Sequence, residues 1–429
     1  MVDSRAAPRQ HGSLAAPEQI HERFRRTRRA TLDLAAPLSA EDCQVQSFPS
    51  ASPVKWHLAH TSWFFETFVL ERSVPGYRAF HPAFRTLFNS YYVSVGPAWS
   101  RMQRGVLTRP ALDDIRAYRA HVDAAMLALL ERDGGSTESA WLVELGLTHE
   151  EQHQELLVTD VKHLLSRNPL FPVYRASIVP EDAAASRLGW LGFDAGLAEI
   201  GHAGDAFAFD NETPRHRVYL AGFELASRPA TNGEWLAFVE DRGYERAELW
   251  LSDGFDAVRA QTWCAPLHWV RVDGAWFEFT LYGLRALDLA APVAHVSFYE
   301  SDAFARWSGA RLPTEFEWER AARDLPVSGN FAAPDHLHPC AAANSSGVLE
   351  QMFGDVWEWT ASAYTPYPGF RPWSGDVGEY NGKFMSNQMV LRGGSCATPP
   401  SHVRATYRNF FHPDARWQFS GVRLARDSR

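Results

Sequence analysis

Cysteine is scarce in this chain, and no long apolar segment is present. The 429 residues include only four cysteines, Cys43, Cys264, Cys340 and Cys396, and no CxxC pair. This scatter argues against a disulfide framework and favours a reducing cytoplasm. No apolar run reaches the roughly 18 residues of a membrane span, and the N-terminal MVDSRAAPRQHGS lacks the apolar core of a signal peptide. We therefore expect a cytoplasmic protein with no membrane partner.

The chain also has no excess of basic residues over acidic ones. The formal net charge is −9 at pH 7, whereas a nucleic-acid-binding protein usually carries a basic stripe or patch. Basic residues gather in one segment of a predicted N-terminal helix, at Arg23, Arg25, Arg26, Arg28 and Arg29. We interpret this segment as a solvated helix face and expect no nucleic-acid partner.

The length and the apolar content indicate a globular protein of two or three domains, at about 100–200 residues per domain. Hydrophobic residues make up 45% of the chain, enough for full cores without a disulfide or metal staple. Tryptophan is unusually frequent, with 16 residues. We assign most of these rings to the core.

The N-terminal part has helical patterning. Residues 1–16 are polar and rich in Ala and Pro, and we expect a disordered tail there. Ser52-Pro53 provides a helix start, and Asn168-Pro169 a stop. The predicted helices span about 18–35, 53–71, 110–132 and 137–167. Four helices with one long crossover, 72–109, predict a four-helix bundle over 17–168.

The C-terminal part loses this periodicity. Pro, Gly, Asp and aromatic residues become more frequent after a linker that we place at 169–188. Short strands are expected at 217–220 and 389–392, and short helices at 231–241, 298–308 and 314–323. The fold class is therefore α+β, with a loop-rich second domain over 189–429.

A candidate metal site lies in the last helix of the bundle. His149 and His153 are four residues apart, so they stand on one helix face and can bind one metal ion. Glu150 occupies the position of the general base in HExxH zinc peptidases, which makes a peptidase a competing hypothesis. A third histidine can come from Trp-His-Leu-Ala-His at 56–60, where His57 and His60 are equal candidates. Such a site suits iron, zinc or copper.

Segments of the second half carry a family resemblance. They read RLPTEFEWE at 311–319, FGDVWEWT at 353–360, LRGGS at 391–395 and FSGVR at 419–423. In this order they resemble the formylglycine-generating, sulfatase-modifying-factor domain, which has a C-type-lectin-like fold. That family binds copper through two cysteines shortly after Gly-Gly-Ser. Thr398 and Val403 occupy those positions here, so we expect that chemistry to be absent.

The first half resembles a DinB-type bundle through 56–60 and 149–153. The fusion of the two domains resembles the non-haem iron sulfoxide synthases of ergothioneine and ovothiol biosynthesis, which bind Fe(II) through three histidines. The resemblance assigns the ligands as His60, His149 and His153, and it favours His60 over His57. It implies a dioxygen-dependent enzyme that joins a thiol sulfur to an imidazole carbon.

The resemblance also implies a pocket for hercynine, which is N-α-trimethylhistidine. In the family, a segment matching Asn409-Phe410-Phe411 contacts this substrate, with the asparagine on its carboxylate and the aromatic residues beside its trimethylammonium group. Aromatic faces attract such a cation by about 0.5–2 kcal/mol per contact. Gln152 matches the position that bonds the imidazole.

The thiol donor is cysteine or γ-glutamylcysteine in this family. Members that use the second donor have Trp-Asp after the asparagine and an Arg a few residues on, whereas this chain has Phe410-Phe411 and Ala415, with Arg416 adjacent. We therefore favour cysteine, which gives hercynyl-cysteine sulfoxide as product.

The crossover segment supports the cysteine-using group. Tyr91-Tyr92 resembles a tyrosine pair of those enzymes, in which one tyrosine delivers a proton, and either residue is a candidate here. Arg101 and Arg104 match the arginines that bind the cysteine carboxylate, a contact suited to the guanidinium fork.

Other functions remain as alternatives. An ovothiol-type enzyme would join cysteine to histidine, and it usually carries a further methyltransferase domain, which we do not expect after Arg429. A γ-glutamylcysteine-using enzyme, a zinc peptidase and a non-catalytic binding module are the others. No oligomeric state is predicted.

Overall fold

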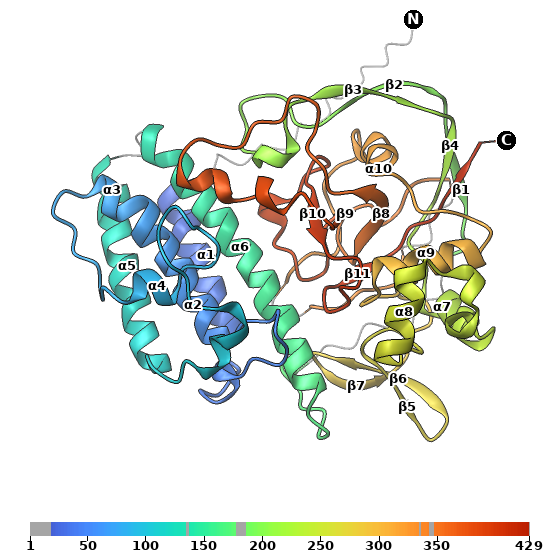
Figure 1. Ribbon diagram of the computed structural model, residues 1–429, viewed down its shortest axis with the longest axis horizontal. Coiled ribbons are helices and arrows are strands. Elements are labelled where there is room, and N and C mark those ends of the chain that lie inside the picture. Colours follow the sequence, from blue (N-terminus) through green and yellow to red (C-terminus); the bar gives the residue numbers. More distant parts are fainter. Residues whose placement is uncertain (1–18, 134–136, 177–185, 334–335, 343–346, 429) are drawn as a thin grey trace, which may run out of the picture.

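A computed structural model of the protein describes residues 19–133, 137–176, 186–333, 336–342 and 347–428. The expected tail at 1–16 lies outside these residues, as does part of the expected linker. Figure 1 shows helices gathered on one side of the molecule and a sheet-rich half on the other, with α6 running along their boundary. No helix in the described part of the chain has the length and apolarity to cross a bilayer.

The N-terminal half is a helical bundle, as predicted. Its helices are α1 (Ile20–Ala35), α2 (Val54–Phe65), α3 (Glu71–Ser73), α4 (Phe84–Leu87), α5 (Leu112–Asp133) and α6 (Thr137–Ser166). A π-helical turn at Glu66–Leu70 joins α2 to α3. The long helices pack pairwise, α1 on α6 and α2 on both α5 and α6. Every residue of α2 is buried, so this helix forms the centre of the bundle.

The sequence-based interpretation of the basic cluster as a solvated face is wrong at Arg28 and only partly right at Arg23, whose side chain is 15% exposed and pairs with Glu144. Arg25, Arg26 and Arg29 are exposed, but Arg28 is only 2% exposed. Its guanidinium pairs with Asp123 at 2.6 Å and Glu150 at 2.9 Å. Helical periodicity turns this residue toward α5 and α6, where two carboxylates compensate for its burial.

The C-terminal half is sheet-rich with short helices. The helices are α7 (Asn232–Glu240), α8 (Ser252–Gln261), α9 (Phe298–Trp307) and α10 (Glu315–Ala322). Thr231, Ser297 and Thr314 begin α7, α9 and α10 with capping boxes, in which the cap hydroxyl and a glutamate satisfy free N–H groups. The sequence predicted these three helices but not α8.

The strands form several small sheets. They are β1 (Trp190–Phe193), β2 (Gly196–Ile200), β3 (His216–Leu220), β4 (Phe223–Ala226), β5 (Trp269–Val272), β6 (Ala275–Thr280), β7 (Gly283–Ala286), β8 (Trp357–Ala363), β9 (Met389–Arg392), β10 (Asn409–Phe411), β11 (Ser420–Gly421) and β12 (Ala425–Asp427). The sheet orders are β1-β4-β12, β10-β9-β8-β11, β2-β3 and β5-β6-β7. In the second, β9 lies antiparallel to β8 and β10, and β11 is parallel to β8.

The two halves share a hydrophobic core. One cluster of buried side chains extends from Phe24 in α1 through Trp63 in α2 to Trp357 and Leu424. The Trp357 indole nitrogen donates to Glu155 of α6 at 2.7 Å, and Ser395 donates to the same carboxylate oxygen at 2.7 Å. The bundle is therefore packed firmly against the sheet that carries β10.

Candidate metal centre and substrate cavity

The histidines singled out by sequence converge in the bundle. His60 comes from α2, and His149 and His153 come from α6. One potential ligand atom of each lies within 4.8 Å of the others, and the ring centroids are 4.6–5.0 Å apart. His60 Nε2 and both ring nitrogens of His149 are buried without a hydrogen-bond partner. Such unpaired nitrogens are costly unless a ligand satisfies them, so this triad can hold a metal ion.

Aromatic rings fix the orientation of the triad. The Trp56 ring stacks on His60 at a centroid distance of 4.4 Å, and Trp63 stacks on it at 5.4 Å. Phe64 packs against His149 at 4.6 Å. These contacts follow from α2, because Trp56, His60 and Phe64 recur every four residues on one side of the helix.

The environment keeps the triad neutral, which is the form that binds metal. Burial lowers the pKa of His60 and His153 well below the usual value, and neighbouring histidines lower it further. Burial also lowers the pKa of His149 to about 3. The Nδ1 atom of His60 lies 2.6 Å from the Phe88 carbonyl oxygen. Because a carbonyl only accepts, Nδ1 carries the proton and Nε2 is left for a ligand.

His57 and His60 have different hydrogen-bond partners in the structure. His57 Nε2 lies 3.1 Å from Asp160 Oδ2, and His57 Nδ1 lies 2.8 Å from His153 Nδ1. Both ring nitrogens of His57 are thus engaged, and this histidine lies outside the triad. Residue type and spacing could not distinguish the two histidines, because their difference depends on partners from other segments.

Glu150 is turned away from the triad. Its carboxylate binds Arg28, Arg119 and Thr31 in the interior of the bundle. Burial alone would raise the pKa of Glu150, but Arg119 and Arg28 hold it below its usual value. Two guanidinium groups hold the Glu150 carboxylate away from the triad, so it cannot activate water at His149 and His153. The triad therefore lacks the general base that a zinc peptidase of this pattern needs.

A cavity of about 360 Å³ opens beside the triad, between the bundle and the sheet-rich half. All six residues predicted to bind substrate line it, and they come from both halves: Arg101, Arg104, Gln152, Asn409, Phe410 and Phe411. His149, His153 and Tyr91 line it as well. Such a concave site, in which polar and charged side chains stand beside aromatic rings, suits a small polar ligand.

Arg104 is a buried cation that makes no salt bridge to any described carboxylate. Its side chain donates to Ser52 at 2.8 Å and Ser90 at 3.1 Å, and its guanidinium lies 3.3 Å from the Trp56 ring centroid. None of the described carboxylates pairs with it, and its Nε has no partner. Burial and the nearby charge of Arg101 lower its pKa. Arg101 is exposed on the cavity wall, and both guanidinium groups line the same cavity.

Three tyrosines gather near the triad. Tyr91 lines the cavity, while the stacked Tyr92 is fully buried and its hydroxyl has no partner. The sequence missed Tyr380, whose ring packs on His149 at 5.8 Å. Burial raises the pKa of Tyr91 to about 12 and that of Tyr92 and Tyr380 well above 10.0. All three phenols are therefore protonated at neutral pH.

Gln152 is held between two tyrosines of the other half. The Tyr380 hydroxyl donates to its Oε1, and its Nε2 donates to the Tyr407 hydroxyl at 2.7 Å. Tyr380 and Tyr407 fall in loops without a recognisable motif. Only the packing of the two halves places them in the cavity.

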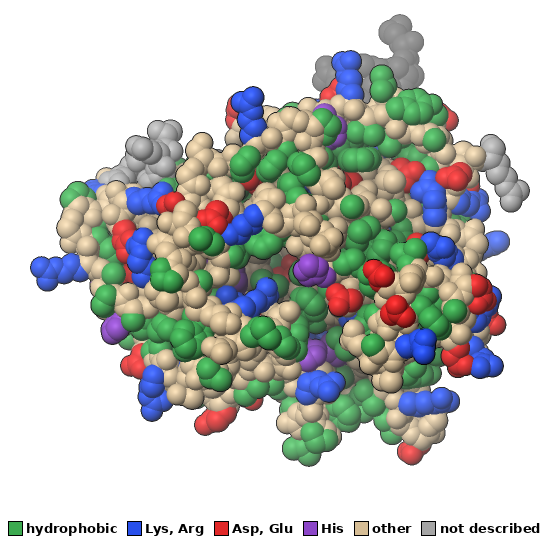
Figure 2. Space-filling model, viewed as in Figure 1, with side chains coloured by type: hydrophobic (Ala, Val, Ile, Leu, Met, Phe, Trp, Pro, Cys, Tyr) green, Lys and Arg blue, Asp and Glu red, His purple; other side chains and the backbone are tan. Residues whose placement is uncertain are grey.

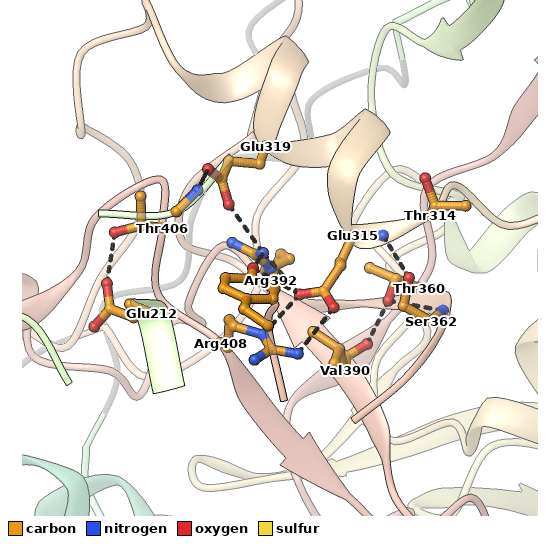
Figure 3. Close-up of polar contacts among 12 residues, drawn as sticks. Glu212, Thr314, Glu315, Glu319, Thr360, Ser362, Val390, Arg392, Thr406 and Arg408 are labelled. Atoms are coloured by element: carbon orange, nitrogen blue, oxygen red, sulfur yellow. Dashed lines mark hydrogen bonds and ion pairs between the residues drawn. The ribbon is translucent and has the colours of Figure 1, made fainter. Parts of the chain in front are cut away.

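The segment Asn409-Phe410-Phe411 forms strand β10. Phe410 stacks on Tyr364 at 4.0 Å, and Phe411 packs on Trp417 at 5.6 Å. Behind the strand, the preceding Arg408 pairs with Glu315, which also pairs with Arg392, as Figure 3 shows. Burial would raise the pKa of Glu315, but Arg408 and Arg392 lower it. This buried network anchors the end of the strand that faces the cavity.

Thr398 and Val403, which stand where the copper-binding family has cysteines, are both buried. Thr398 is buried and accepts a hydrogen bond from the Ser395 backbone at 2.8 Å. Val403 packs into the apolar core of the sheet-rich half.

On the face drawn in Figure 2, the described Lys and Arg side chains are scattered among acidic ones rather than gathered in a patch.

Comparisons with known proteins identify both halves. Residues 23–157 match the DinB superfamily, and residues 179–346 and 326–428 match the sulfatase-modifying factor enzyme 1-like domain. The hercynine oxygenase of Mycobacterium tuberculosis is 34% identical, covering 96% of this chain and 100% of that protein. The hercynine oxygenase of Mycolicibacterium smegmatis is 32% identical with the same coverage.

The second half also has relatives of its own. The formylglycine-generating enzyme of Streptomyces coelicolor is 28% identical, covering 60% of this chain and 95% of that protein. The hercynine oxygenases, however, match the chain across both halves. The chain belongs to the hercynine oxygenase family and is an oxygenase built from a DinB-like bundle and a sulfatase-modifying-factor-like domain.

Proposed function

We propose that this protein is an Fe(II)-dependent sulfoxide synthase that joins the sulfur of cysteine to the imidazole carbon of hercynine. One observation carries the proposal: the histidine triad adjoins a cavity that combines a buried arginine free of salt bridges with an aromatic wall. In the overall reaction, an imidazole C–H and the thiol S–H are lost while C–S and S–O bonds form. One oxygen atom of dioxygen enters the sulfoxide and the other leaves as water.

His60, His149 and His153 would hold the iron. Their donor set also suits zinc and copper, and we choose iron because the sequence resembles the non-haem iron sulfoxide synthases. Bound there, Fe(II) supplies open coordination positions and the redox capacity for reaction with dioxygen. The protein's own residues bind and orient the substrates, which removes most of the entropy cost of bringing them together.

Hercynine would lie against β10. Asn409 would bond its carboxylate, and Phe410 and Phe411, which line the cavity with it, would border the trimethylammonium group. Gln152 would meet the imidazole, since its amide is already oriented by Tyr380 and Tyr407. A rigid amide orients a ring with little further loss of entropy.

Cysteine would bind through its carboxylate at Arg104 and Arg101. The other candidate cation for a longer donor, Arg416, is buried and pairs with Glu300 at 2.8 Å. It also donates to the Ala265 carbonyl. Because Arg416 is engaged elsewhere and Phe411 replaces an acidic residue, the cavity favours free cysteine over γ-glutamylcysteine.

A tyrosine would supply the proton. Tyr91 reaches the cavity directly, and Tyr92 holds an unpartnered hydroxyl behind it. Their raised pKa values keep both protonated, as a general acid in a dry site requires. Tyr380 is a third donor, although its hydroxyl is already bonded to Gln152.

A substrate comparison tests this function. The Fe(II)-loaded protein is given dioxygen with hercynine or histidine, each with cysteine or γ-glutamylcysteine, and kcat/KM is measured for the sulfoxide product. We expect hercynine with cysteine to be the best pair. A preference for histidine would indicate the ovothiol-type reaction, and a preference for γ-glutamylcysteine would overturn the donor assignment. No product with any pair would overturn the function.

A further inference from the structure

A chain of polar contacts extends outward from the triad along α2 and α6. Asp160 Oδ2 accepts from the Ser52 backbone N–H at 2.9 Å and lies 3.1 Å from His57 Nε2. His57 Nδ1 then lies 2.8 Å from His153 Nδ1. Asp160 and His57 are 7% and 2% exposed, so bulk water does not compete with these contacts.

The proton positions along this chain follow from the acceptors. Asp160 Oδ2 accepts the Ser52 N–H, and we take the same oxygen as the acceptor from His57, so the proton between Asp160 and His57 belongs to His57 Nε2. A neutral His57 then has a bare Nδ1, which accepts a hydrogen bond. The proton between the two histidines therefore belongs to His153 Nδ1. This arrangement leaves His153 Nε2 without a proton.

From this geometry we propose that His57, oriented by Asp160, is a positioning residue that fixes His153 as its Nδ1–H tautomer and thereby presents Nε2 to the metal. The inference rests on the metal site of the proposed function and adds a role outside the three ligands. Outer partners of this kind orient metal-bound histidines and raise their basicity. The unusual feature is that an imidazole stands between the carboxylate and the ligand.

The other two ligands differ in their outer contacts. His60 is oriented by the Phe88 carbonyl, and His149 has no hydrogen-bond partner on either nitrogen. His153 is thus the triad member whose tautomer depends on other side chains. Loss of His57 should affect His153 and leave His60 unchanged.

Three variants of the full-length protein isolate this role. His57→Phe keeps a planar ring but removes both nitrogens. His57→Asn retains an acceptor, because its amide oxygen occupies roughly the place of Nδ1. His163→Phe is the matched control: this half-buried α6 histidine bonds Ser47 at 2.8 Å and makes no hydrogen bond to the triad. Thermal unfolding of each variant establishes that it is folded.

Affinity for Co(II), added alone, is the first measurement. We expect His57→Phe to bind Co(II) about 10–100-fold more weakly than the wild type, the range seen when an outer partner of a metal ligand is removed. His57→Asn should recover most of the loss, and His163→Phe should match the wild type. A folded His57→Phe with wild-type affinity would overturn the proposal.

The second measurement is the NMR spectrum of the Co(II)-loaded protein. Exchangeable N–H protons of metal-bound imidazoles are shifted far from the protein envelope, and those of His60 and His153 should be protected. In His57→Phe, the His153 signal should exchange faster while the His60 signal stays. An unchanged His153 signal would contradict the tautomer assignment. A wild type that binds neither Co(II) nor Fe(II) would instead overturn the metal site itself.

Discussion

At the scale of single residues, the partners of a side chain decide its role more than its type does. Ser52 was predicted as a helix cap, yet α2 begins at Val54 with Pro53 as its cap residue. Ser52 instead supports Arg104 through its hydroxyl and Asp160 through its N–H. The sequence could place histidines and arginines near one another, but it could not show which nitrogen or hydroxyl each would meet.

Arg104 gives the first prediction. Arg104→Ala should raise KM for cysteine about tenfold or more, because a hydrogen bond to a charged group contributes about 1.5–3 kcal/mol. KM for hercynine should change much less. Arg85→Ala, which removes an exposed arginine paired with Glu71, serves as control. An equal effect on both KM values would contradict a carboxylate site at Arg104.

The tyrosines give the second prediction. Tyr91→Phe should lower kcat for sulfoxide formation by about 10²-fold or more, the usual contribution of a general acid, with little change in either KM. Tyr77→Phe is the control, since the Tyr77 hydroxyl bonds Glu66 at 2.9 Å inside the bundle. If Tyr380→Phe lowers kcat and Tyr91→Phe does not, the proton comes from the sheet-rich half.

At the scale of elements, local signals predicted the regular parts and missed the loops that complete the site. Helical periodicity predicted α1, α2, α5 and α6, and the T/S-x-x-E sequences coincide with the starts of α7, α9 and α10. The strand pairings were not predictable, because their order joins distant segments such as β8 and β11. For the same reason, the sequence could not bring Tyr380 to His149.

Glu379 of the sheet-rich half forms hydrogen bonds with the segment that carries Tyr91 and Tyr92. Its carboxylate accepts from the Ser94 N–H at 2.8 Å, the Ser94 hydroxyl at 2.6 Å and the Val93 N–H at 3.2 Å. Lys383 pairs with Glu379 at 2.6 Å and donates to the Tyr91 carbonyl. Although burial acts to raise it, these bonds lower the pKa of Glu379 to about 2.

The contacts of Glu379 predict how the free energy of unfolding depends on pH. A carboxylate with a lowered pKa in the folded state stabilises the fold above its unfolded pKa and loses that effect as pH falls through the folded value. The difference in unfolding free energy between wild type and Glu379→Gln should therefore be constant above about pH 4.5 and vanish toward pH 2. A pH-independent difference would show that the charge of Glu379 is not involved.

At the scale of the whole molecule, the cavity exists only where the two halves meet. The triad and Arg104 come from the bundle, whereas the aromatic wall comes from β10 and its neighbours. Family resemblance could indicate both halves from the sequence, but not the cavity between them. The shared core and the contacts of Glu155 with Trp357 and Ser395 hold this arrangement.

Trp357→Phe tests that coupling. The change removes a donor from a fully buried carboxylate, so it should lower the free energy of unfolding by about 1–3 kcal/mol. Because the core is continuous, denaturant unfolding followed by tryptophan fluorescence and by circular dichroism should stay coincident. Two separated transitions in the wild type would contradict a shared core.

The sulfoxide synthase reaction is tested by the mass spectrum of the product formed under isotope-labelled dioxygen. The Fe(II)-loaded protein is supplied with hercynine, cysteine and labelled dioxygen in ordinary water. We expect a hercynyl-cysteine sulfoxide that carries one labelled oxygen atom. A missing product, or a sulfoxide whose oxygen comes from water, would overturn the proposed reaction.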